Sequence, residues 1–273
     1  MRDFIIGGGF IGCALKTLMP EATLISKGLG NVFPLVLVHH FEGWEKFYPK
    51  AEIKTCKLEY EQGYNIDEYF QKSRGEESLY SVVANDEMPK NFQFLDFSYE
   101  EYFDSFDFMD GFVTELYPEK HCFVLHRQKV YYDNLFITIP LVVLKFKTDE
   151  EAKMKKKLAL FEIPGGVREN KITYFSNKLY HRTWEFKSKA VSGIYIEQSV
   201  DSILPNNIVL NSPTGIGKFL GIFGGHVSGK LGQSQEEFLK KNDIYVYGRN
   251  ARLTYERIDQ VIEKIIFDFG QRR

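Results

Sequence analysis

The amino-acid sequence predicts an α/β fold in which a parallel sheet is interleaved with an antiparallel one. Residues 3–26 have the pattern of a strand, a glycine-rich turn, a helix and a second strand. Residues 112–140 read as three short strands leading into a continuous apolar strand, and residues 171–197 alternate like antiparallel strands. A strand over 243–247 and a helix from about 258 to 267 close the chain. The parallel sheet therefore begins and ends the chain, and the antiparallel part is inserted within it.

The opening unit carries a regularly spaced glycine motif. Gly7, Gly9 and Gly12 have the G-x-G-x-x-G spacing, between an apolar strand and a helix that starts near Phe10. The first glycine permits a tight turn, the second lets a pyrophosphate approach the backbone, and the third lets helix and strand pack closely. The helix N-terminus adds free N–H groups and the positive end of its dipole. The motif predicts dinucleotide binding, and the alternative is a structural glycine turn.

The second strand, over residues 22–26, ends differently from that motif. An acidic residue normally closes this strand and binds the adenosine ribose, whereas Ser26 and Lys27 stand here. Ser26 could bond a ribose hydroxyl and Lys27 could meet a phosphate. The alternative is that both are solvated turn residues.

Composition excludes several classes of protein. The chain has 273 residues, a net charge of −2 and three cysteines far apart in the sequence. This charge does not favour bulk attraction to nucleic acid or to an acidic membrane. The cysteines form no disulfide or zinc pattern and fit a reducing cytosol, and no apolar stretch approaches the ~20 residues of a membrane span. We therefore expect a cytoplasmic protein with no metal site.

The remaining stretches are less regular. His39 and His40 follow an apolar run and should point to opposite faces of a strand end, one toward the core and one toward the surface. The polar and aromatic residues 42–106 indicate a small, partly helical cap. Residues 149–160 indicate a lysine-rich helix, and residues 203–233 indicate loops.

One of those loops imitates a phosphate-binding motif. Residues 224–230 have the glycine and lysine spacing of a P-loop. However, Leu231 stands where Ser or Thr should hold magnesium, and no convincing strand precedes the segment. We therefore expect a loop that does not bind phosphate.

Three segments together resemble a known family. They are the glycine unit, the meander ending in Thr138-x-Pro140, and the segment GRNARLTYERIDQVI over residues 248–262. The last looks like the G-R-x-A-x-x-x-Y-x-x-M-D-x-x-I segment of UDP-galactopyranose mutases, with Ile258 in place of methionine. Residues 173–187, with Tyr180, Arg182, Glu185 and Lys187, are similar to the mutase N-Y … Y-T-R-x-x-E-x-K strand pair. The chain thus resembles a shortened FAD-binding flavoprotein of the UDP-galactopyranose mutase and amine oxidase (protoporphyrinogen oxidase-like) group.

The resemblance implies a division of the chain into interleaved parts. A Rossmann-like FAD-binding sheet would be built from residues 1–41, 107–145 and 243–273. An antiparallel-sheet substrate domain would occupy residues 150–242, and the small cap would occupy residues 42–106. The mutases carry a helical domain of about a hundred residues that grips the uridine, and only this cap is available in its place.

The motif and the resemblance together give the expected FAD-binding residues. These are Gly7, Gly9, Phe10, Ile11, Gly12, Ser26, Lys27, Val113, Thr138, Pro140, Gly248, Arg249, Ile258, Asp259 and Gln260. The last three would begin the C-terminal helix, where Asp259 could accept hydrogen bonds from the ribityl hydroxyls. The alternative for Asp259 is an acid that complements the helix dipole.

The resemblance also implies catalytic residues and a function. In the mutases the matching arginines face the substrate diphosphate and the matching tyrosine bonds a phosphate oxygen, which gives Arg182, Arg249 and Tyr255. For Arg182 the alternative is a strand arginine paired with Glu185 or another acid. We expect a FAD-dependent enzyme whose flavin N5 acts on an anionic substrate, either a small molecule or a nucleotide-linked one. The alternatives are an amine-oxidase-like enzyme acting on a C–N bond and a non-catalytic dinucleotide-binding module.

Overall fold

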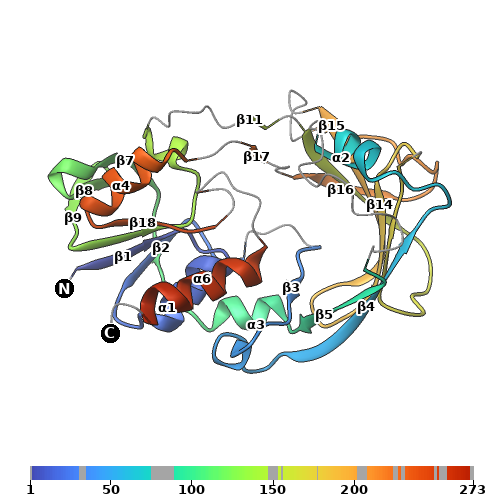
Figure 1. The fold of residues 1–273 in the computed structure, drawn as a ribbon, viewed down its shortest axis with the longest axis horizontal. Coiled ribbons are helices and arrows are strands. Elements are labelled where there is room, and N and C mark those ends of the chain that lie inside the picture. The colour runs from blue at the N-terminus through green and yellow to red at the C-terminus, as the bar shows by residue number, and fades with distance from the viewer. Residues whose placement is uncertain are drawn as a thin grey trace.

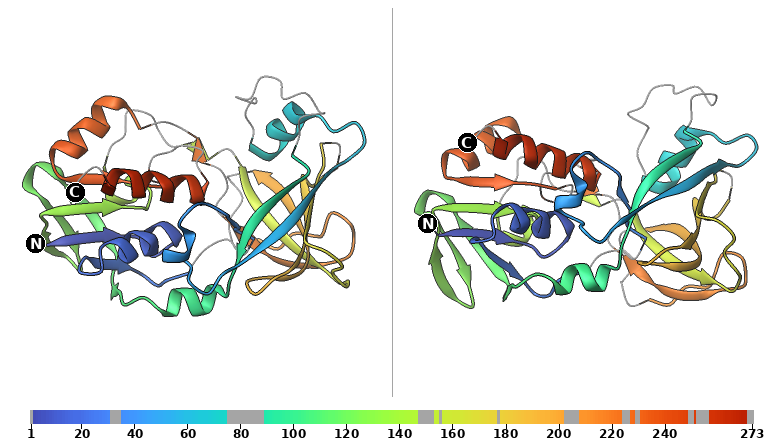
Figure 2. Two further views of the ribbon diagram at one scale, coloured as in Figure 1. Left: turned by 60° about the horizontal axis from the view of Figure 1, so that its bottom comes forward. Right: turned by 90° about the horizontal axis from the view of Figure 1, so that it is seen from below.

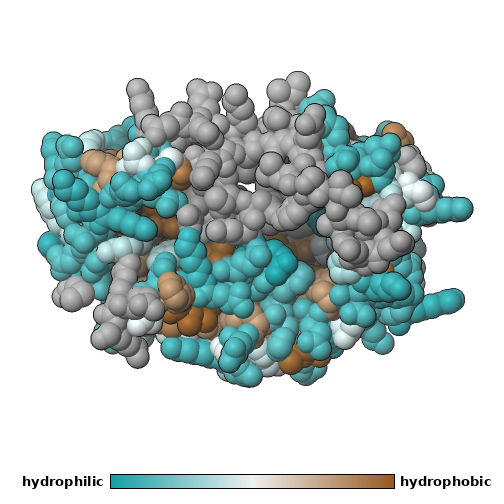
Figure 3. Space-filling model, viewed as in Figure 1, coloured by the Kyte–Doolittle hydropathy of each residue, from teal (hydrophilic) through white to brown (hydrophobic). Residues whose placement is uncertain are grey.

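The computed structural model describes most of the chain. The described residues are 2–30, 35–74, 89–146, 153–154, 156–176, 178–201, 208–223, 227–228, 231–248, 251 and 257–270. They form two halves, a parallel sheet with its helices and a large antiparallel sheet (Figure 1). The described residues on the face shown in Figure 3 are mostly hydrophilic, with apolar side chains in small, separate patches. The α/β fold class expected from the sequence is confirmed.

The parallel sheet has the strand order β18-β10-β1-β2-β6. Its strands are β1 (Asp3–Ile6), β2 (Thr23–Ser26), β6 (Met109–Asp110), β10 (Asn134–Ile137) and β18 (Ile244–Val246), and all pairs are parallel. Helix α1 (Phe10–Leu18) connects β1 to β2 and packs with α6 (Ile258–Gly270) on one face (Figures 1 and 2). The meander β7 (Val113–Tyr117), β8 (Cys122–Leu125) and β9 (Gln128–Tyr131), together with helix α4 (Gln233–Lys241), covers the other face.

Burial on both faces explains the apolar runs in β1 and β10. Ile5 and Phe136 pack against the helices, whereas Ile6 and Ile137 pack against the meander. A strand covered on both sides loses the alternation of polar and apolar residues. At the end of α1, the amine of Lys16 donates to the carbonyls that follow the helix, at distances of 2.6 and 2.8 Å. A cation there complements the negative end of the helix dipole.

The antiparallel half is an eight-stranded sheet in the order β16-β12-β15-β14-β13-β4-β5-β3. Its strands are β3 (Val38–His39), β4 (Glu52–Tyr60), β5 (Asn91–Asp96), β12 (Lys156–Ile163), β13 (Lys171–Tyr174), β14 (Arg182–Lys187), β15 (Ser192–Asp201) and β16 (Lys218–Phe223). One neighbouring pair, β13 and β4, runs parallel. The smaller elements are α2 (Ile66–Arg74), α3 (Tyr99–Asp104), η1 (Trp44–Lys46), η3 (Pro118–Lys120), η4 (Leu141–Leu144) and the ladder of β11 (Lys153–Met154) with β17 (Val227–Ser228).

Three stretches differ from the sequence-based expectation. Residues 42–106 contain α2 and α3, as a helical cap would, but they also supply β4 and β5 to the large sheet. The expected lysine-rich helix over 149–160 is wrong, because residues 156–163 form β12. Within the expected loops of 203–233, residues 218–223 form β16, while part of the P-loop-like segment lies outside the described residues. The division of the chain into domains stays a prediction.

The reason for the β12 error is that this strand is covered on both faces. Leu160 belongs to one hydrophobic cluster and Phe161 to another on the opposite side. The apolar run of β12, residues 158–161, is only four residues long and follows a lysine-rich stretch, so periodicity alone did not distinguish this strand from the end of an exposed helix.

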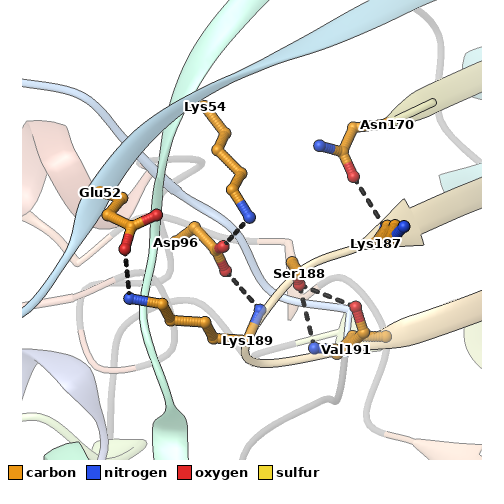
Figure 4. A network of polar contacts seen from close by, with 8 residues as sticks. All are labelled: Glu52, Lys54, Asp96, Asn170, Lys187, Ser188, Lys189 and Val191. Atoms are coloured by element: carbon orange, nitrogen blue, oxygen red, sulfur yellow. Dashed lines mark hydrogen bonds and ion pairs between the residues drawn. The ribbon is translucent and has the colours of Figure 1, made fainter.

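A buried carboxylate joins two hairpins of the large sheet (Figure 4). Asp96, at the end of β5, is 1% exposed and accepts the backbone N–H of Lys189 at 2.7 Å. Its other oxygen pairs with the amine of Lys54 on β4. The Lys189 amine in turn reaches Glu52 at 2.7 Å. The turn between β14 and β15 is thereby fixed against β4 and β5.

We predict that Asp96→Ala lowers the free energy of unfolding by about 3 kcal/mol, because it leaves a buried N–H and a partly buried amine without their acceptor. Urea denaturation measures the loss. The matched control is Glu101→Ala, since the Lys50–Glu101 pair joins side chains that are 80% and 64% exposed. Such a pair contributes under ~1 kcal/mol. Equal losses in the two variants would contradict the role assigned to Asp96.

Candidate functional site

The glycine turn after β1 has the close contacts that its motif requires. Gly7 has a φ of 114°, and a Cβ added to it would lie 2.3 Å from the hydroxyl of Thr138. A Cβ on Gly12 would lie 1.8 Å from the carbonyl oxygen of Gly7. Thr138 itself follows β10 and donates its hydroxyl to Ile6 O at 3.1 Å. The turn is therefore fixed between β1, β10 and α1.

The N-terminus of α1 is open toward a ligand. Gly9 is the N-cap residue, and no side chain caps the helix. A Cβ on Gly9 would have no atom within 4 Å, in contrast to Gly7 and Gly12. Phe10 is 3% exposed and packs into the core, so it offers only its backbone to a ligand. Free helix N–H groups beside open space fit a pyrophosphate.

The end of β2 is tied into a turn. Ser26 donates its hydroxyl to the carbonyl of Gly28 at 2.6 Å, which is the turn role considered as the alternative for this residue. The amine of Lys27 lies 4.7 Å from the ring centre of Phe112. Val113, the next residue, is 1% exposed, so that any contact it makes with a cofactor comes from its backbone.

Gly248, shortly after β18, lies close to helix α1, against which α6 also packs. A Cβ on Gly248, which has a φ of 92°, would lie 3.7 Å from Ile11 in α1. The helix begins at Ile258, as expected. Asp259 is 4% exposed, and its carboxylate accepts from the guanidinium of Arg257 at 2.8–3.2 Å. The alternative role of Asp259, complementing the helix terminus, is therefore present.

The side chain of Gln260 has a capping role. Its carbonyl oxygen accepts the backbone N–H of Arg257 at 3.0 Å. A Gln at this position completes half of a capping box and satisfies a backbone donor ahead of the first turn. Gln260 therefore contributes to the start of α6, and its backbone N–H stays at the helix N-terminus.

His39 is a residue near this site whose role the sequence did not reveal. Its ring stacks on Phe92 at 4.4 Å, with 23° between the planes. Burial lowers the pKa of His39, while nearby Asp259 raises it and Arg257 lowers it. His39 is half-buried and His40 is exposed, so neither histidine lies in the core. The influence of Asp259 places β3 beside the start of α6.

Arg182 belongs to a polar cluster on the antiparallel sheet. Its Nη2 donates to Glu197 Oε1 at 2.6 Å, and its guanidinium lies 4.4 Å from the ring centre of Trp184. Glu197 is 0% exposed and also accepts from Trp184 Nε1 at 3.0 Å. His181 Nε2 lies 2.6 Å from the same Oε1. The expected acid partner is therefore present, but it is Glu197; Glu185 pairs with Lys171 at 3.0 Å.

The charges of this cluster are balanced. Although burial raises the pKa of Glu197, Arg182 and His181 lower it further, to about 2. The carboxylate therefore stays ionised at neutral pH and offsets the charge of Arg182. Among the described residues, none bonds the buried Nε of Arg182, whose side chain is 23% exposed. The guanidinium is thus fixed, with N–H donors left over.

The remaining expected site residues divide into two groups. Pro140 follows Thr138 at the end of β10 and precedes η4, beside the glycine turn. Arg249 and Tyr255 lie outside the described residues, so the expected pairing of Arg182 with Arg249 is not tested. The structure brings together the residues around α1, β2, β10 and α6. Arg182 lies in the other half of the molecule, on β14 (Figure 1).

The two cysteines with shifted pKa values are both buried. Burial raises the pKa of Cys13 and of Cys56 to about 12, so both thiols stay protonated at neutral pH. Over the described ranges, no cluster of three or more His, Cys, Asp or Glu residues is placed to hold a metal ion. Among the residues that the structure describes, no helix is both long and apolar enough to cross a membrane.

Known proteins match this chain through their structures. No family model matches it, and no curated protein matches it. A reduced UDP-galactopyranose mutase has a TM-score of 0.68 at 12% identity, over 99% of this chain and 96% of that one. A fatty acid isomerase from P. acnes has a TM-score of 0.60 at 9% identity, over 99% and 98%. CtdE, solved with FAD and a substrate, has a TM-score of 0.54 at 11% identity, over 96% and 78%. The chain has the fold of FAD-binding flavoenzymes.

We predict that Glu197→Gln lowers the free energy of unfolding at pH 7 by about 3–5 kcal/mol, because Arg182 loses its buried counter-charge. The pKa of Glu197, about 2, lies below its unfolded value of ~4.3. Its contribution is therefore complete above ~4.3 and is lost as the pH falls toward 2. The difference in the free energy of unfolding between Glu197→Gln and wild type should therefore decrease as the pH falls from ~4.3 to about 2, and chemical denaturation at several pH values measures it. Glu185→Gln is the control, and its free energy of unfolding should vary with pH as that of the wild type does. A difference between Glu197→Gln and wild type that does not change with pH would contradict the prediction.

Proposed function

We propose that the protein is a FAD-dependent enzyme resembling UDP-galactopyranose mutase, acting on a small anionic substrate. The observation that carries this proposal is the open N-terminus of α1 above Gly9, held by the close contacts at Gly7 and Gly12. The whole-chain similarity to a mutase structure supports it. Helix α6, which packs with α1 on the same face of the parallel sheet, would provide a second helix N-terminus for the same cofactor.

The residues of the chain have separate tasks in this proposal. Bound FAD supplies the group-transfer or redox chemistry at its flavin ring. The backbone of Gly9 to Gly12 binds the pyrophosphate, Thr138 fixes the turn, and the first turn of α6 approaches the flavin end. Arg182, Arg249 and Tyr255 hold the anionic group of the substrate. Arginine suits this task because its planar N–H groups bond a phosphate or carboxylate at two points.

Two related functions use the same site. An amine-oxidase-like enzyme would use Arg182 to anchor a carboxylate while a C–N bond is oxidised. A non-catalytic module would need the glycine turn alone. The fixed guanidinium of Arg182, with its buried Glu197 and stacked Trp184, favours an enzyme, because a binding module has no need of such a cluster.

We predict that Gly9→Val releases FAD and leaves the protein folded. The added Cβ would point into open space at the helix N-terminus, with no atom of the described residues within 4 Å. Flavin content per protein, from the absorbance near ~450 nm, should fall to near zero while circular dichroism is unchanged. Gly166→Val is the matched control, because Gly166 also has no atom within 4 Å of an added Cβ and lies between β12 and β13. A full flavin complement in Gly9→Val would refute the proposed pyrophosphate site.

We predict that Arg182→Lys keeps both the fold and FAD but loses substrate turnover. Lysine preserves the counter-charge of Glu197, whereas its ammonium lacks the planar pair of donors. Turnover of UDP-galactopyranose, the substrate named for the mutase, should fall at least a hundredfold, as expected from losing a charged two-point contact. Lys187→Arg, a change at the other end of β14, serves as the control. Unchanged turnover in Arg182→Lys would remove Arg182 from the substrate site.

A further inference from the structure

The adenosine ribose has no acidic partner in β2. Strand β2 ends at Ser26 and is followed by Lys27, and the Ser26 hydroxyl proton is already donated to Gly28. A dinucleotide lying over the carboxyl ends of these strands leaves its ribose close to this point. If the ribose hydroxyls are bound by a carboxylate, it must come from another element.

Asp110 is a carboxylate on the strand next to β2, at the same level of the sheet. Strand β6 lies next to β2 and runs parallel to it, and Asp110 is the register partner of Ser26. Both are the last residues of their strands, so both stand at the edge of the sheet that bears the glycine turn. Neighbouring strands are about 4.8 Å apart. A side chain on β6 can therefore reach a ligand that lies over the end of β2.

The backbone around Asp110 is fixed, whereas its carboxylate is available. The N–H of Gly111 donates to Ser26 O at 3.0 Å, and His126 Nε2 lies 3.1 Å from the carbonyl oxygen of Asp110. A Cβ on Gly111 would lie 2.6 Å from the side chain of Leu125, so the chain packs tightly there. Asp110 is exposed, and its carboxylate bonds to none of the residues that the structure describes.

We propose that Asp110 binds the adenosine ribose hydroxyls of FAD, in place of the acid that β2 lacks. This inference rests on the proposed function, because it requires a bound dinucleotide. An ionised carboxylate accepts hydrogen bonds through both oxygens, which suits the two adjacent hydroxyls of a ribose. Lys27 and Phe112, which contact each other at 4.7 Å, flank the same position. The competing interpretation is a solvated acid at a strand end.

The test compares Asp110→Asn with the wild type and with Asp107→Asn. Asp107 is also exposed and precedes β6, so its substitution makes the same charge change three residues away. FAD release from each purified holoprotein is followed by flavin fluorescence on dilution. ADP and 2′,3′-dideoxy-ADP are then compared as competitors that displace FAD. Because Asp110 is exposed, the substitution leaves the core unchanged, which thermal unfolding verifies.

Asp110→Asn should raise the dissociation constants of FAD and ADP about tenfold, as expected for losing a hydrogen bond to a charged group. Wild type should prefer ADP over dideoxy-ADP by about the same factor, and the preference should vanish in Asp110→Asn. Asp107→Asn should match the wild type.

Three other outcomes would overturn the role of Asp110, and they distinguish its failure from failure of the proposed function. If wild type binds FAD but Asp110→Asn keeps wild-type affinities and the preference for ADP, the inference is wrong and the proposed function stands. If Asp107→Asn weakens binding equally, the effect is one of general surface charge, and the inference is again wrong. If wild type binds no FAD, both the proposed function and the inference fail.

Discussion

The close packing of α1 on β1 is the constraint on which the rest of the structure depends. The carbonyl oxygen of Gly7 leaves no room for a side chain at Gly12. That contact sets the start of the helix directly above the end of the strand, so the free N–H groups point past Gly9 into open space. It also brings Ile11 close to Gly248, which follows β18. The place of the α1 N-terminus therefore depends on Gly7 and Gly12, two glycines at which a side chain would not fit.

The antiparallel half is joined to this region through strand β3. Val38 is fully buried in the same hydrophobic cluster as Phe10 and Val261, although β3 belongs to the eight-stranded sheet. The next residue, His39, is close enough to Asp259 for the carboxylate to influence its pKa. The sheet that carries Arg182 is thus anchored beside α6 by its edge strand. Asp96 then fixes the turn after β14 against β5.

Local patterns predicted the parallel half well. Short motifs of neighbouring residues are enough to predict the strand, turn and helix at the N-terminus. The same holds for the start of α6 at Ile258. The antiparallel half was harder, since β12 and β4 become strands only because a sheet surrounds them. Neither shows the clean alternation of a half-buried strand, and tertiary pairing decided their conformation.

The candidate site divides in the same way. Gly7, Gly9 and Gly12 could be assigned from spacing alone, whereas Glu197 could be found only by aligning two strands. Its signal was an acid directly after the apolar residues 194–196, and the register places it directly opposite Arg182. Asp110 gave no signal in the sequence, because its relation to Ser26 exists only once β6 pairs with β2.

The buried acids of this chain are each paired with a basic side chain. Asp96 pairs with Lys54, Glu197 with Arg182 and His181, and Asp259 with Arg257. In the proposed function, a substrate anion would meet at Arg182 a guanidinium that already has a carboxylate at 2.6 Å. Its binding would then depend on the direction of the remaining N–H donors, which Glu197 and Trp184 fix. A site of this kind would distinguish anions by the geometry of their oxygen atoms more than by their total charge.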